Sequence, residues 1–365
     1  MSEWQTFYLK DLGKIVGGAT PSTNNPKNYG NKIAWITPKD LSTLQGRYIK
    51  KGSRSISRLG FKSCSCVLLP KHAILFSSRA PIGYVAIAKK RLCTNQGFKS
   101  IIPNKKIYFE FLYYLLKYHK DNISNIGGGT TFKEVSGATL GLFKVKIPPT
   151  YYEQQKIART LSILDQKIEN NHKINELLHT LAYKIYEYYF KYKPKNAKLE
   201  QIIIENPKSS IMVKNAQKTQ DKYPFFTSGD NILSYPKAII DGRNCFLNTG
   251  GNAGIKFYVG KASYSTDTWC ICANEFSDYL YLLLSSIKTH INQSFFQGTS
   301  LKHLQKNLLK KYPIYMPSAH EIKKFNQIIM PLLTLISINT RTSKKLEQIR
   351  DFLLPLLLKQ QVKPQ

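Results

Sequence analysis

Residues 153 to 190 carry apolar side chains at steps of four and three positions. This spacing brings one side chain per turn to the same face of an α-helix, and its average of about 3.5 residues is typical of a coiled-coil contact face. Asn171 and Asn175 interrupt the apolar run once. The pattern predicts one long helix from Glu153 to Phe190. Its contact positions, seam 1, are Ile157, Leu161, Leu164, Ile168, Asn171, Asn175, Leu178, Ala182, Ile185 and Tyr189.

The same spacing recurs 168 positions later, and polar residues interrupt it at the corresponding positions. This second pattern predicts a long helix near the C-terminus. Pro331 and Pro355 predict a kink or a break in it, because proline cannot donate the helical hydrogen bond. Its contact positions, seam 2, are Phe325, Ile329, Leu332, Ile336, Asn339, Ser343, Leu346, Arg350, Leu353 and Leu357.

Shorter motifs repeat at nearly the same offset. Gly129-Thr-Thr-Phe-Lys133 corresponds to Gly298-Thr-Ser-Leu-Lys302, and the run 112–116 corresponds to 280–284. A proline-containing strand pattern precedes each long helix. Ordered matches at offsets of 168 or 169 indicate that the chain is a tandem duplication of a globular domain followed by a long helix.

Between the long helices, short apolar runs alternate with turns rich in Gly, Pro and Asn. Such runs predict strands, here at 33–37, 65–69, 73–76, 84–88, 199–204, 244–248 and 255–259, with medium helices at 108–118 and 278–288. We predict an α+β fold with two mostly antiparallel domains, each followed by a long helix, and an antiparallel coiled coil between the two helices. The predicted parts are 1–149, 150–195, 196–317 and 318–365.

The net charge of +32 points to a polyanionic partner. Residues 1–149 contain 24 Lys and Arg against 6 Asp and Glu, and residues 196–317 contain 14 against 8. Two basic domains suit nucleic-acid binding. A lysine-rich composition from an AT-rich genome is the alternative, but it does not explain the shortage of acids in the first domain. No apolar run of about 18 residues and no signal-peptide pattern is present, which predicts a cytoplasmic protein.

Motifs for catalysis or metal binding are mostly missing from the sequence. The two Cys-x-Cys pairs, at 64/66 and 270/272, lie in apolar runs and predict buried structural thiols, not metal ligands. Gly250-Gly-Asn-Ala-Gly-Ile-Lys256 lacks the Lys-Ser/Thr ending of a phosphate-binding loop. Glu205-Asn-Pro-Lys208 lacks the second proline and the aromatic residue of an adenine methyltransferase loop. We predict a chain with no metal site and no catalytic residues of its own.

Several motifs together resemble the DNA-specificity subunit of type I restriction-modification systems. In the first half they are Gly18-Ala-Thr-Pro-Ser22, Trp35-Ile-Thr-Pro-Lys-Asp40, Ser78-Arg-Ala-Pro-Ile-Gly83, Asn95-Gln-Gly97, Gly129-Thr-Thr-Phe-Lys133 and Glu153-Gln-Gln-Lys-Ile157. In the second half they are Tyr223-Pro-Phe-Phe-Thr-Ser-Gly229, Gly251-Asn-Ala-Gly254, Gly298-Thr-Ser-Leu-Lys302, and Pro317 with Glu321. The second half lacks the Thr-Pro and Trp-Ile-Thr-Pro motifs.

The resemblance implies a non-catalytic targeting subunit for double-stranded DNA. Each globular domain would recognise one half of a split site, and the two long helices would set the spacing and dock the partners. Those partners would be adenine methyltransferase subunits, two per chain, and through them the restriction nuclease-translocase. S-adenosylmethionine, ATP and magnesium would then belong to the partners, and this chain would hold no cofactor.

The DNA-binding candidates lie in the polar loops between the strands. Arg and Lys suit guanine and Asn and Gln suit adenine, so the base-contacting candidates are Lys39, Arg79, Gln96, Asn248, Asn252 and Lys256. Hydroxyl groups and the remaining lysines suit phosphates, and Gly83 and Ser228 complete the motif loops. For any single candidate, a role in holding a turn is equally open. This second group is Thr20, Ser22, Gly83, Thr130, Thr131, Lys133, Thr227, Ser228, Thr299, Ser300 and Lys302.

Two other function classes stay open at this point. The chain could be the recognition half of a fused restriction-methylation enzyme, which a catalytic reading frame directly upstream would support and the start at Met1 disfavours. It could also be a duplicated coiled-coil adaptor without DNA specificity, for which DNA binding should depend only weakly on salt.

Overall fold

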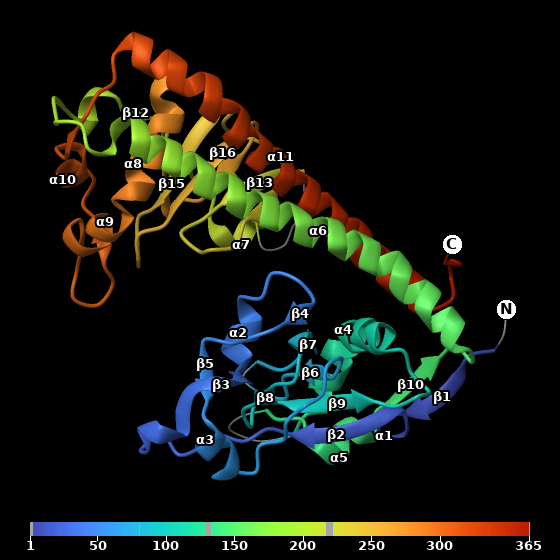
Figure 1. The fold of residues 1–365 in the computed structure, drawn as a ribbon. Coiled ribbons are helices and arrows are strands. Elements are labelled where there is room, and N and C mark those ends of the chain that lie inside the picture. The colour runs from blue at the N-terminus through green and yellow to red at the C-terminus, as the bar shows by residue number, and fades with distance from the viewer. Residues whose placement is uncertain (1–2, 80, 129–132, 217–221, 365) are drawn as a thin grey trace. The chain divides into compact units, whose positions relative to one another are not determined.

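The computed structural model describes residues 3–79, 81–128, 133–216 and 222–364 (Figure 1). The chain divides into two compact units. Unit 1 comprises residues 1–170 together with 344–365, and unit 2 comprises residues 171–343. Both units contain sheets and helices, which confirms the predicted α+β class.

Two helices are far longer than the rest. Helix α6 (Tyr151–Tyr186) contains 36 residues and continues into a π-helical turn, η2 (Glu187–Lys191). Helix α11 (Ala319–Leu358) contains 40 residues and includes Pro331 and Pro355. The predicted break at these prolines is therefore wrong, and the alternative of a kink stays a prediction. Pro331 has no N–H group, so the Gln327 carbonyl four positions earlier lacks its helical hydrogen bond. Both residues are exposed, and this carbonyl therefore lies on the solvent side of the helix.

Both long helices begin with the same local chemistry. The Thr150 Oγ1 atom accepts a hydrogen bond from the Glu153 backbone N–H, and it donates to the Glu153 carboxylate. At α11 the Ser318 Oγ atom accepts from the Glu321 N–H, while the Glu321 carboxylate accepts from the Ser318 N–H. These caps satisfy backbone groups that a helix start leaves unpaired.

Unit 1 is built on two main sheets and a short strand pair. A five-stranded sheet has the order β2-β9-β6-β7-β4, a three-stranded sheet has the order β5-β3-β8, and β1 pairs with β10. The strands are β1 (Gln5–Tyr8), β2 (Gly13–Gly17), β3 (Tyr29–Ile36), β4 (Tyr48–Ile49), β5 (Arg54–Ile56), β6 (Ile74–Phe76), β7 (Val85–Ala88), β8 (Cys93–Thr94), β9 (Lys99–Pro103) and β10 (Lys144–Ile147). The helices are α1 (Leu9–Leu12), η1 (Pro26–Asn28), α2 (Pro38–Ser42), α3 (Arg58–Lys62), α4 (Phe109–Asn125) and α5 (Gly137–Gly141).

Unit 2 contains a four-stranded sheet, β12-β18-β15-β16, and a three-stranded sheet, β14-β13-β17. Two short pairs, β11-β21 and β19-β20, complete it. The strands are β11 (Ala197–Lys198), β12 (Ile204–Glu205), β13 (Tyr223–Phe226), β14 (Leu233–Tyr235), β15 (Arg243–Asn248), β16 (Ile255–Val259), β17 (Ser263–Tyr264), β18 (Thr268–Cys272), β19 (Phe296–Gln297), β20 (His303–Leu304) and β21 (Pro313–Ile314). The helices are η3 (Leu199–Gln201), α7 (Val213–Ala216), η4 (Asn274–Phe276), α8 (Ser277–Ser286), α9 (Lys288–Ser294) and α10 (Lys306–Lys310).

Central strands in both units have apolar residues on both faces. In β6, Ile74 and Phe76 join one hydrophobic core while Leu75 joins another. In β15, Cys245 and Leu247 enter one core and Phe246 enters a second. Successive side chains of a strand point to opposite faces, so a strand covered on both sides is apolar throughout. This explains why these strands appear as unbroken apolar runs in the sequence.

Two predicted strands do not form as predicted. Residues 65–68 are irregular, and Leu69 makes only an isolated bridge to Leu92. The Cys66 thiol is directed at the Ala19 carbonyl oxygen, 3.1 Å away. In the predicted strand 199–204, Leu199–Gln201 forms a 3-10 turn that the Gln201 side chain caps, and only Ile204 belongs to a strand. At 199–201 a local side-chain bond outweighed the apolar pattern. At Cys66 the contact is with a residue 47 positions away.

In unit 1 a buried arginine joins the sheet to α6. Arg47 is 3% exposed, and its guanidinium lies 3.0 Å from the Glu110 carboxylate in α4 and 3.2 Å from the Glu169 carboxylate in α6. Asp165 of α6 accepts a hydrogen bond from the Tyr114 hydroxyl at 2.6 Å and pairs with Arg350 of α11 at 2.7 Å. This network fixes the long helices of unit 1 against its globular part.

Unit 2 uses one arginine for the corresponding connection. Arg243, at the start of β15, makes two 2.5 Å hydrogen bonds to the Asp278 carboxylate in α8. Its remaining donors bind the Thr334 hydroxyl at 3.0 Å and the Met330 carbonyl at 3.2 Å, both in α11. Burial raises the pKa of Asp278 above its ordinary value although Arg243 opposes this shift.

Candidate nucleic-acid interface

In unit 1, five loops meet at one end of the sheets. Backbone hydrogen bonds join Ser78 N to Gly97 O at 2.8 Å, Val135 N to Ser78 O at 2.9 Å and Asn95 N to Ile36 O at 2.9 Å. Ala19 N also donates to Thr94 O at 3.0 Å. We call this surface edge 1; its described residues are 18–22, 37–40, 77–79 with 81–83, 95–97 and 133–135.

Edge 1 brings together several residues predicted to bind DNA. The Thr20 hydroxyl donates a hydrogen bond to the Gln96 side-chain oxygen. Gly18 lies so close to the next loop that a Cβ atom would be 2.1 Å from the Asn95 carbonyl oxygen. Ser22, Lys39, Gln96 and Lys133 are exposed. Lys39 belongs to α2, whose N-terminus is fixed by hydrogen bonds from Thr37 to Asp40.

Arg79 lies at edge 1 beside an acidic residue. Its guanidinium is 3.7 Å from one oxygen of Glu134, while the Lys99 ammonium group is 3.5 Å from the other. Arg79 would have to leave Glu134, or share it, to bind a base. Gly83 has a φ of +97° and closes the 77–83 turn, in which the Ser77 hydroxyl donates to Pro81 O at 2.8 Å. Thr130 and Thr131 lie outside the described residues.

Unit 2 has a corresponding surface, which we call edge 2. Thr249 N donates to Asp267 O at 3.2 Å, Leu304 N to Thr249 O at 3.0 Å and Ser265 N to Phe226 O at 2.9 Å. Gly251 N donates to Lys302 O at 2.9 Å. Edge 2 comprises residues 227–229, 248–254, 265–267 and 298–303.

Of the three residues predicted to contact bases in unit 2, Lys256 and Asn248 are directed at protein atoms, whereas Asn252 is exposed. The Lys256 ammonium group donates to Thr227 O and Gly229 O at 2.7 Å each, and lies 3.4 Å from the Asn248 side-chain oxygen. Burial lowers the pKa of Lys256. Asn248 is 7% exposed and donates to Asn252 O at 3.1 Å. This arrangement suits a role in holding the loops of edge 2.

Apart from Asn252, the exposed candidates of edge 2 lie on a hairpin. Thr299, Ser300 and Lys302 are exposed between β19 and β20. Gly298 begins the turn with a φ of +139°, and a Cβ atom there would be 2.4 Å from the Leu301 carbonyl oxygen. Ser228 donates its hydroxyl to Asp267 O, and Thr227 accepts from Gly229 N, so both stabilise the neighbouring turn.

Some residues that form the two edges or hold their loops were not predicted from the sequence. Asn95 accepts a hydrogen bond from Gly97 N at 3.0 Å, and Asn292 accepts one from Ala253 N at 2.8 Å. The Asn-x-Gly spacing at 95–97 is a turn signal that could have identified the first. Asn292 and Glu134 have no such local signal, because their contacts come from distant parts of the chain.

The seam positions of both long helices are buried or half-buried. In unit 1, Ile157 and Leu161 share a core with Leu354 and Leu357. In unit 2, Ala182 shares a core with Phe325, Ile329 and Ile336. Of the predicted spacer residues, the buried ones are Ile157, Leu161, Ile168, Phe325, Ile329 and Ile336, and the half-buried ones are Leu164, Asn171, Leu178, Ile185, Leu332, Asn339, Leu346 and Leu353.

The polar residues that interrupt the two seams are hydrogen-bonded to each other within unit 2. Asn171 Nδ2 donates to the Ser343 hydroxyl at 3.1 Å, and Asn339 Nδ2 donates to Asn175 Oδ1 at 2.9 Å. Asn175 Nδ2 also lies 3.4 Å from the Thr340 hydroxyl. Residue numbers rise along α6 as they fall along α11 in these contacts.

Each long helix carries a second, exposed apolar stripe that was not predicted from the sequence. In unit 2, Leu177 of α6 is 70% exposed. The stripe positions are spaced like the seam positions but lie on another face of each helix, so the signal was present in the sequence. We call them the outer stripe; in unit 2 they are Ile174, Leu177, Leu181, Ile328, Leu335 and Ile338, all exposed.

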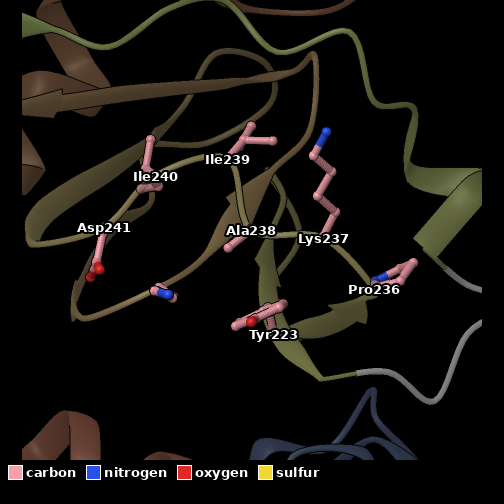
Figure 2. Close-up of a pocket in the computed structure, with 8 residues that line it drawn as sticks. Tyr223, Pro236, Lys237, Ala238, Ile239, Ile240 and Asp241 are labelled. Atoms are coloured by element: carbon pink, nitrogen blue, oxygen red, sulfur yellow. The ribbon is translucent and has the colours of Figure 1, made fainter.

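A shallow depression of about 510 Å³ lies on unit 2 along the connection between β14 and β15 (Figure 2). Tyr223, Lys237, Asp241 and Lys261 contribute its polar side chains. Figure 2 shows Lys237 and Asp241 at opposite ends of the segment and pointing apart. Their groups do not converge on one point, as those of a specific small-molecule site would.

Among the described residues, no group of three or more His, Cys, Asp or Glu side chains could hold a metal ion. Glu205 accepts a hydrogen bond from the Trp269 indole at 2.8 Å, and Asn206 donates to Asn244 at 2.8 Å, so this motif contributes to packing. Within the described ranges, no helix is long and apolar enough to cross a bilayer.

Comparison with known proteins gives a consistent result over the full chain. The family model described as the type I restriction modification DNA specificity domain matches twice, at residues 1–180 and 195–348. A type I restriction enzyme specificity subunit, MjaIX from Methanocaldococcus jannaschii, is 33% identical, with 98% of this chain and 93% of that protein covered. The HindI specificity subunit from Haemophilus influenzae is 30% identical over 46% of this chain and 37% of its own length.

A solved structure supports the fold independently. The type I restriction-modification S subunit from M. genitalium matches with a TM-score of 0.64 at 17% identity, covering 97% of this chain and 96% of that one. At this identity the likeness concerns the fold alone. The family match over both halves and the 33% identity to the MjaIX subunit show that the chain belongs to the type I restriction-modification DNA-specificity family.

Proposed function

We propose that this chain is the DNA-specificity subunit of a type I restriction-modification complex. It binds a split DNA site, with one half at each edge, and has no catalytic residues of its own. The observation that carries this proposal is the common backbone frame of the two edges. The bonds Ser78 N to Gly97 O and Val135 N to Ser78 O in unit 1 recur as Thr249 N to Asp267 O and Leu304 N to Thr249 O in unit 2. Different side chains project from equivalent frames, as two different half-sites require.

We infer from the strand pairings that the chain is a tandem duplication. The parallel pairing of Ile36 with Thr94 recurs as Phe226 with Tyr264. The antiparallel pairing of Ile74 with Ile101 recurs as Cys245 with Ile271. On this basis, residues 1–149 and 196–317 are the two recognition domains, and 150–195 and 318–365 are the spacer helices.

The long helices act as the spacer between the domains by packing as an antiparallel coiled coil. The Asn171–Ser343 and Asn339–Asn175 contacts support this, because a shift of 168 positions converts one pair into the other. A helix of 36 residues at a rise of about 1.5 Å is roughly 54 Å long. Buried polar pairs favour one register of a coiled coil, which would fix the distance between the half-sites.

The outer stripe is the docking surface for adenine methyltransferase subunits. The stripes of α6 and α11 occupy the same heptad positions, and equivalent positions lie on the same side of an antiparallel pair. An exposed apolar face of this kind is typical of a protein interface. The internal repeat provides two equivalent surfaces, so two methyltransferase subunits bind per chain and bring the nuclease-translocase with them. S-adenosylmethionine, ATP and magnesium are bound by these partners.

The function is tested by producing the chain with the adenine methyltransferase from the same genome and mapping methylated adenines across DNA. The methyltransferase alone is the control. We expect a motif of two short specified halves around an unspecified spacer, which requires this chain. Methylation that does not change when the chain is present, although a complex forms, would contradict the proposal and favour an adaptor.

The docking surface is tested by Leu177→Asp, with the exposed neighbour Lys173→Asp as the matched control. We expect the first variant to lose the methyltransferase in a pull-down while it still binds DNA, because a buried carboxylate would disrupt an apolar interface. Retention of the methyltransferase by Leu177→Asp would exclude this surface.

A further inference from the structure

We infer that Arg54 recognises a guanine in the half-site bound by unit 1. This inference rests on the proposed function and extends it to a residue outside the motifs that the family resemblance rests on. The geometry points to Arg54 through three features: an aromatic support, a direct connection to edge 1 and the charges around it.

The Arg54 guanidinium lies on two aromatic rings. Its central carbon is 4.1 Å from the centre of the Tyr29 ring and 5.9 Å from the Trp35 ring. The two rings meet edge to face, with centroids 6.2 Å apart and planes at 76°. β5 pairs with β3, and Arg54 is directly opposite Trp35 in that pairing. Cation–π contact with Tyr29 and Trp35 restricts the side chain before any ligand binds.

The two supporting rings also bind the loop that carries Thr20. The Trp35 indole donates to Ala19 O at 3.0 Å, and the Tyr29 hydroxyl donates to Pro21 O at 3.0 Å. Thr20, between these residues, is hydrogen-bonded to Gln96. Arg54 is therefore tied through its aromatic support to the loop at edge 1 that presents Thr20 and Gln96.

The charges at the two arginines differ. Arg79 lies within ion-pair distance of Glu134. Among the described residues, no carboxylate is within ion-pair distance of the exposed Arg54 side chain. Binding a base by Arg54 would break no protein ion pair.

A guanine fits this arrangement better than a phosphate group. The planar guanidinium can donate two parallel hydrogen bonds to guanine O6 and N7. Such a contact requires a fixed orientation of the side chain, which the aromatic support supplies, whereas a phosphate contact tolerates a mobile charge. Lysine cannot replace arginine in this geometry because its ammonium group lacks the planar pair of donors.

The test maps methylated adenines for the complete complex with Arg54→Ala, Arg54→Lys and the control Arg58→Ala, an exposed arginine four positions along the chain. We expect Arg54→Ala to tolerate other bases at one guanine position of one half-site, with discrimination there reduced on the order of tenfold to a hundredfold. The other half-site stays specified, which shows that the variant is folded. Arg54→Lys should lose most of the same discrimination, and Arg58→Ala should match the unchanged chain.

Two outcomes would overturn the inference. In the first, Arg54→Ala keeps the complete motif. In the second, it weakens methylation equally at all sequences and lowers the salt dependence of DNA binding by about one unit, as a phosphate contact would. If Arg54→Ala abolishes methylation altogether, an unchanged motif in Arg54→Lys overturns the inference and a relaxed guanine position supports it. Absence of a split motif for the unchanged chain would instead contradict the proposed function itself.

Discussion

The two edges use the same backbone hydrogen bonds and differ in where their long polar side chains point. At edge 1, Lys39 and Gln96 are exposed. At edge 2, Lys256 and Asn248 bind protein oxygens, and the exposed candidates are Asn252 and the 298–302 hairpin. Backbone bonds do not depend on side-chain identity. A frame made of them lets the side chains of one unit change without loss of the fold.

The connections between the globular parts and the long helices differ in a similar way. In unit 1, Arg47 lies among Glu110, Asp165 and Glu169. In unit 2, Arg243 has one carboxylate partner, Asp278, and otherwise binds neutral groups. The globular part is therefore joined to its long helix by a network of charged side chains in unit 1 and by a single ion pair in unit 2.

This difference predicts unequal costs when each arginine is replaced by methionine. Arg47→Met leaves the half-buried carboxylates of Glu110 and Glu169 without their shared cation, while Asp165 keeps Arg350. It should destabilise unit 1 by about 3–5 kcal/mol. Arg243→Met leaves only Asp278, whose pKa is already raised and which can take up a proton, so the cost to unit 2 should be about 1–3 kcal/mol. Hydrogen exchange of peptides from each unit measures both values, and equal losses would contradict the comparison.

Each edge contains a glycine that lies against neighbouring atoms, and replacing the two glycines by alanine should have unequal costs in stability. In Gly18→Ala, the new Cβ atom would lie 2.1 Å from the Asn95 carbonyl oxygen, and that backbone cannot move without opening edge 1. In Gly254→Ala, the nearest atom is the Asn248 side-chain nitrogen at 2.3 Å, which can rotate at the cost of its hydrogen bonds. We expect a loss of about 2–3 kcal/mol for the first and about 1 kcal/mol for the second. Urea unfolding followed by hydrogen exchange tests this order, and the reverse order would be incompatible with it.

The smallest predicted effect concerns the start of α11 in unit 2. Hydrogen bonds from Lys193, the Ser318 N–H and Tyr315 lower the pKa of Glu321 from 4.5 to about 2. A carboxyl whose pKa is lower in the folded state stabilises that state above its unfolded pKa and loses this effect as the pH falls. Glu321→Gln should cost less than about 1 kcal/mol above pH 4.5, and this cost should shrink as the pH falls to about 2 and disappear below it. Unfolding of both proteins across this pH range measures the difference, and a cost that does not change with pH would exclude the mechanism.

The sequence predicts the long elements of this fold better than the contacts between them. The seams were visible because they repeat over many turns, and β6 and β15 because both of their faces are apolar. The inward direction of Lys256 depends on two carbonyl groups of residues 227 and 229, nearly thirty positions away. Such a contact leaves no local pattern, so a lysine in a loop looks the same whether it faces solvent or protein. The outer stripe was detectable but was masked by the stronger seam.

The central claim is that the two edges recognise separate halves of one site. It is tested most directly by mapping methylated adenines for two variants of the complete complex, Gln96→Ala at edge 1 and a double replacement of Ser300 and Lys302 by alanine at edge 2. The account predicts that each variant relaxes a different half of the motif and leaves the other half and the spacer unchanged. Relaxation of the same half by both variants, or of both halves by either one, would contradict it.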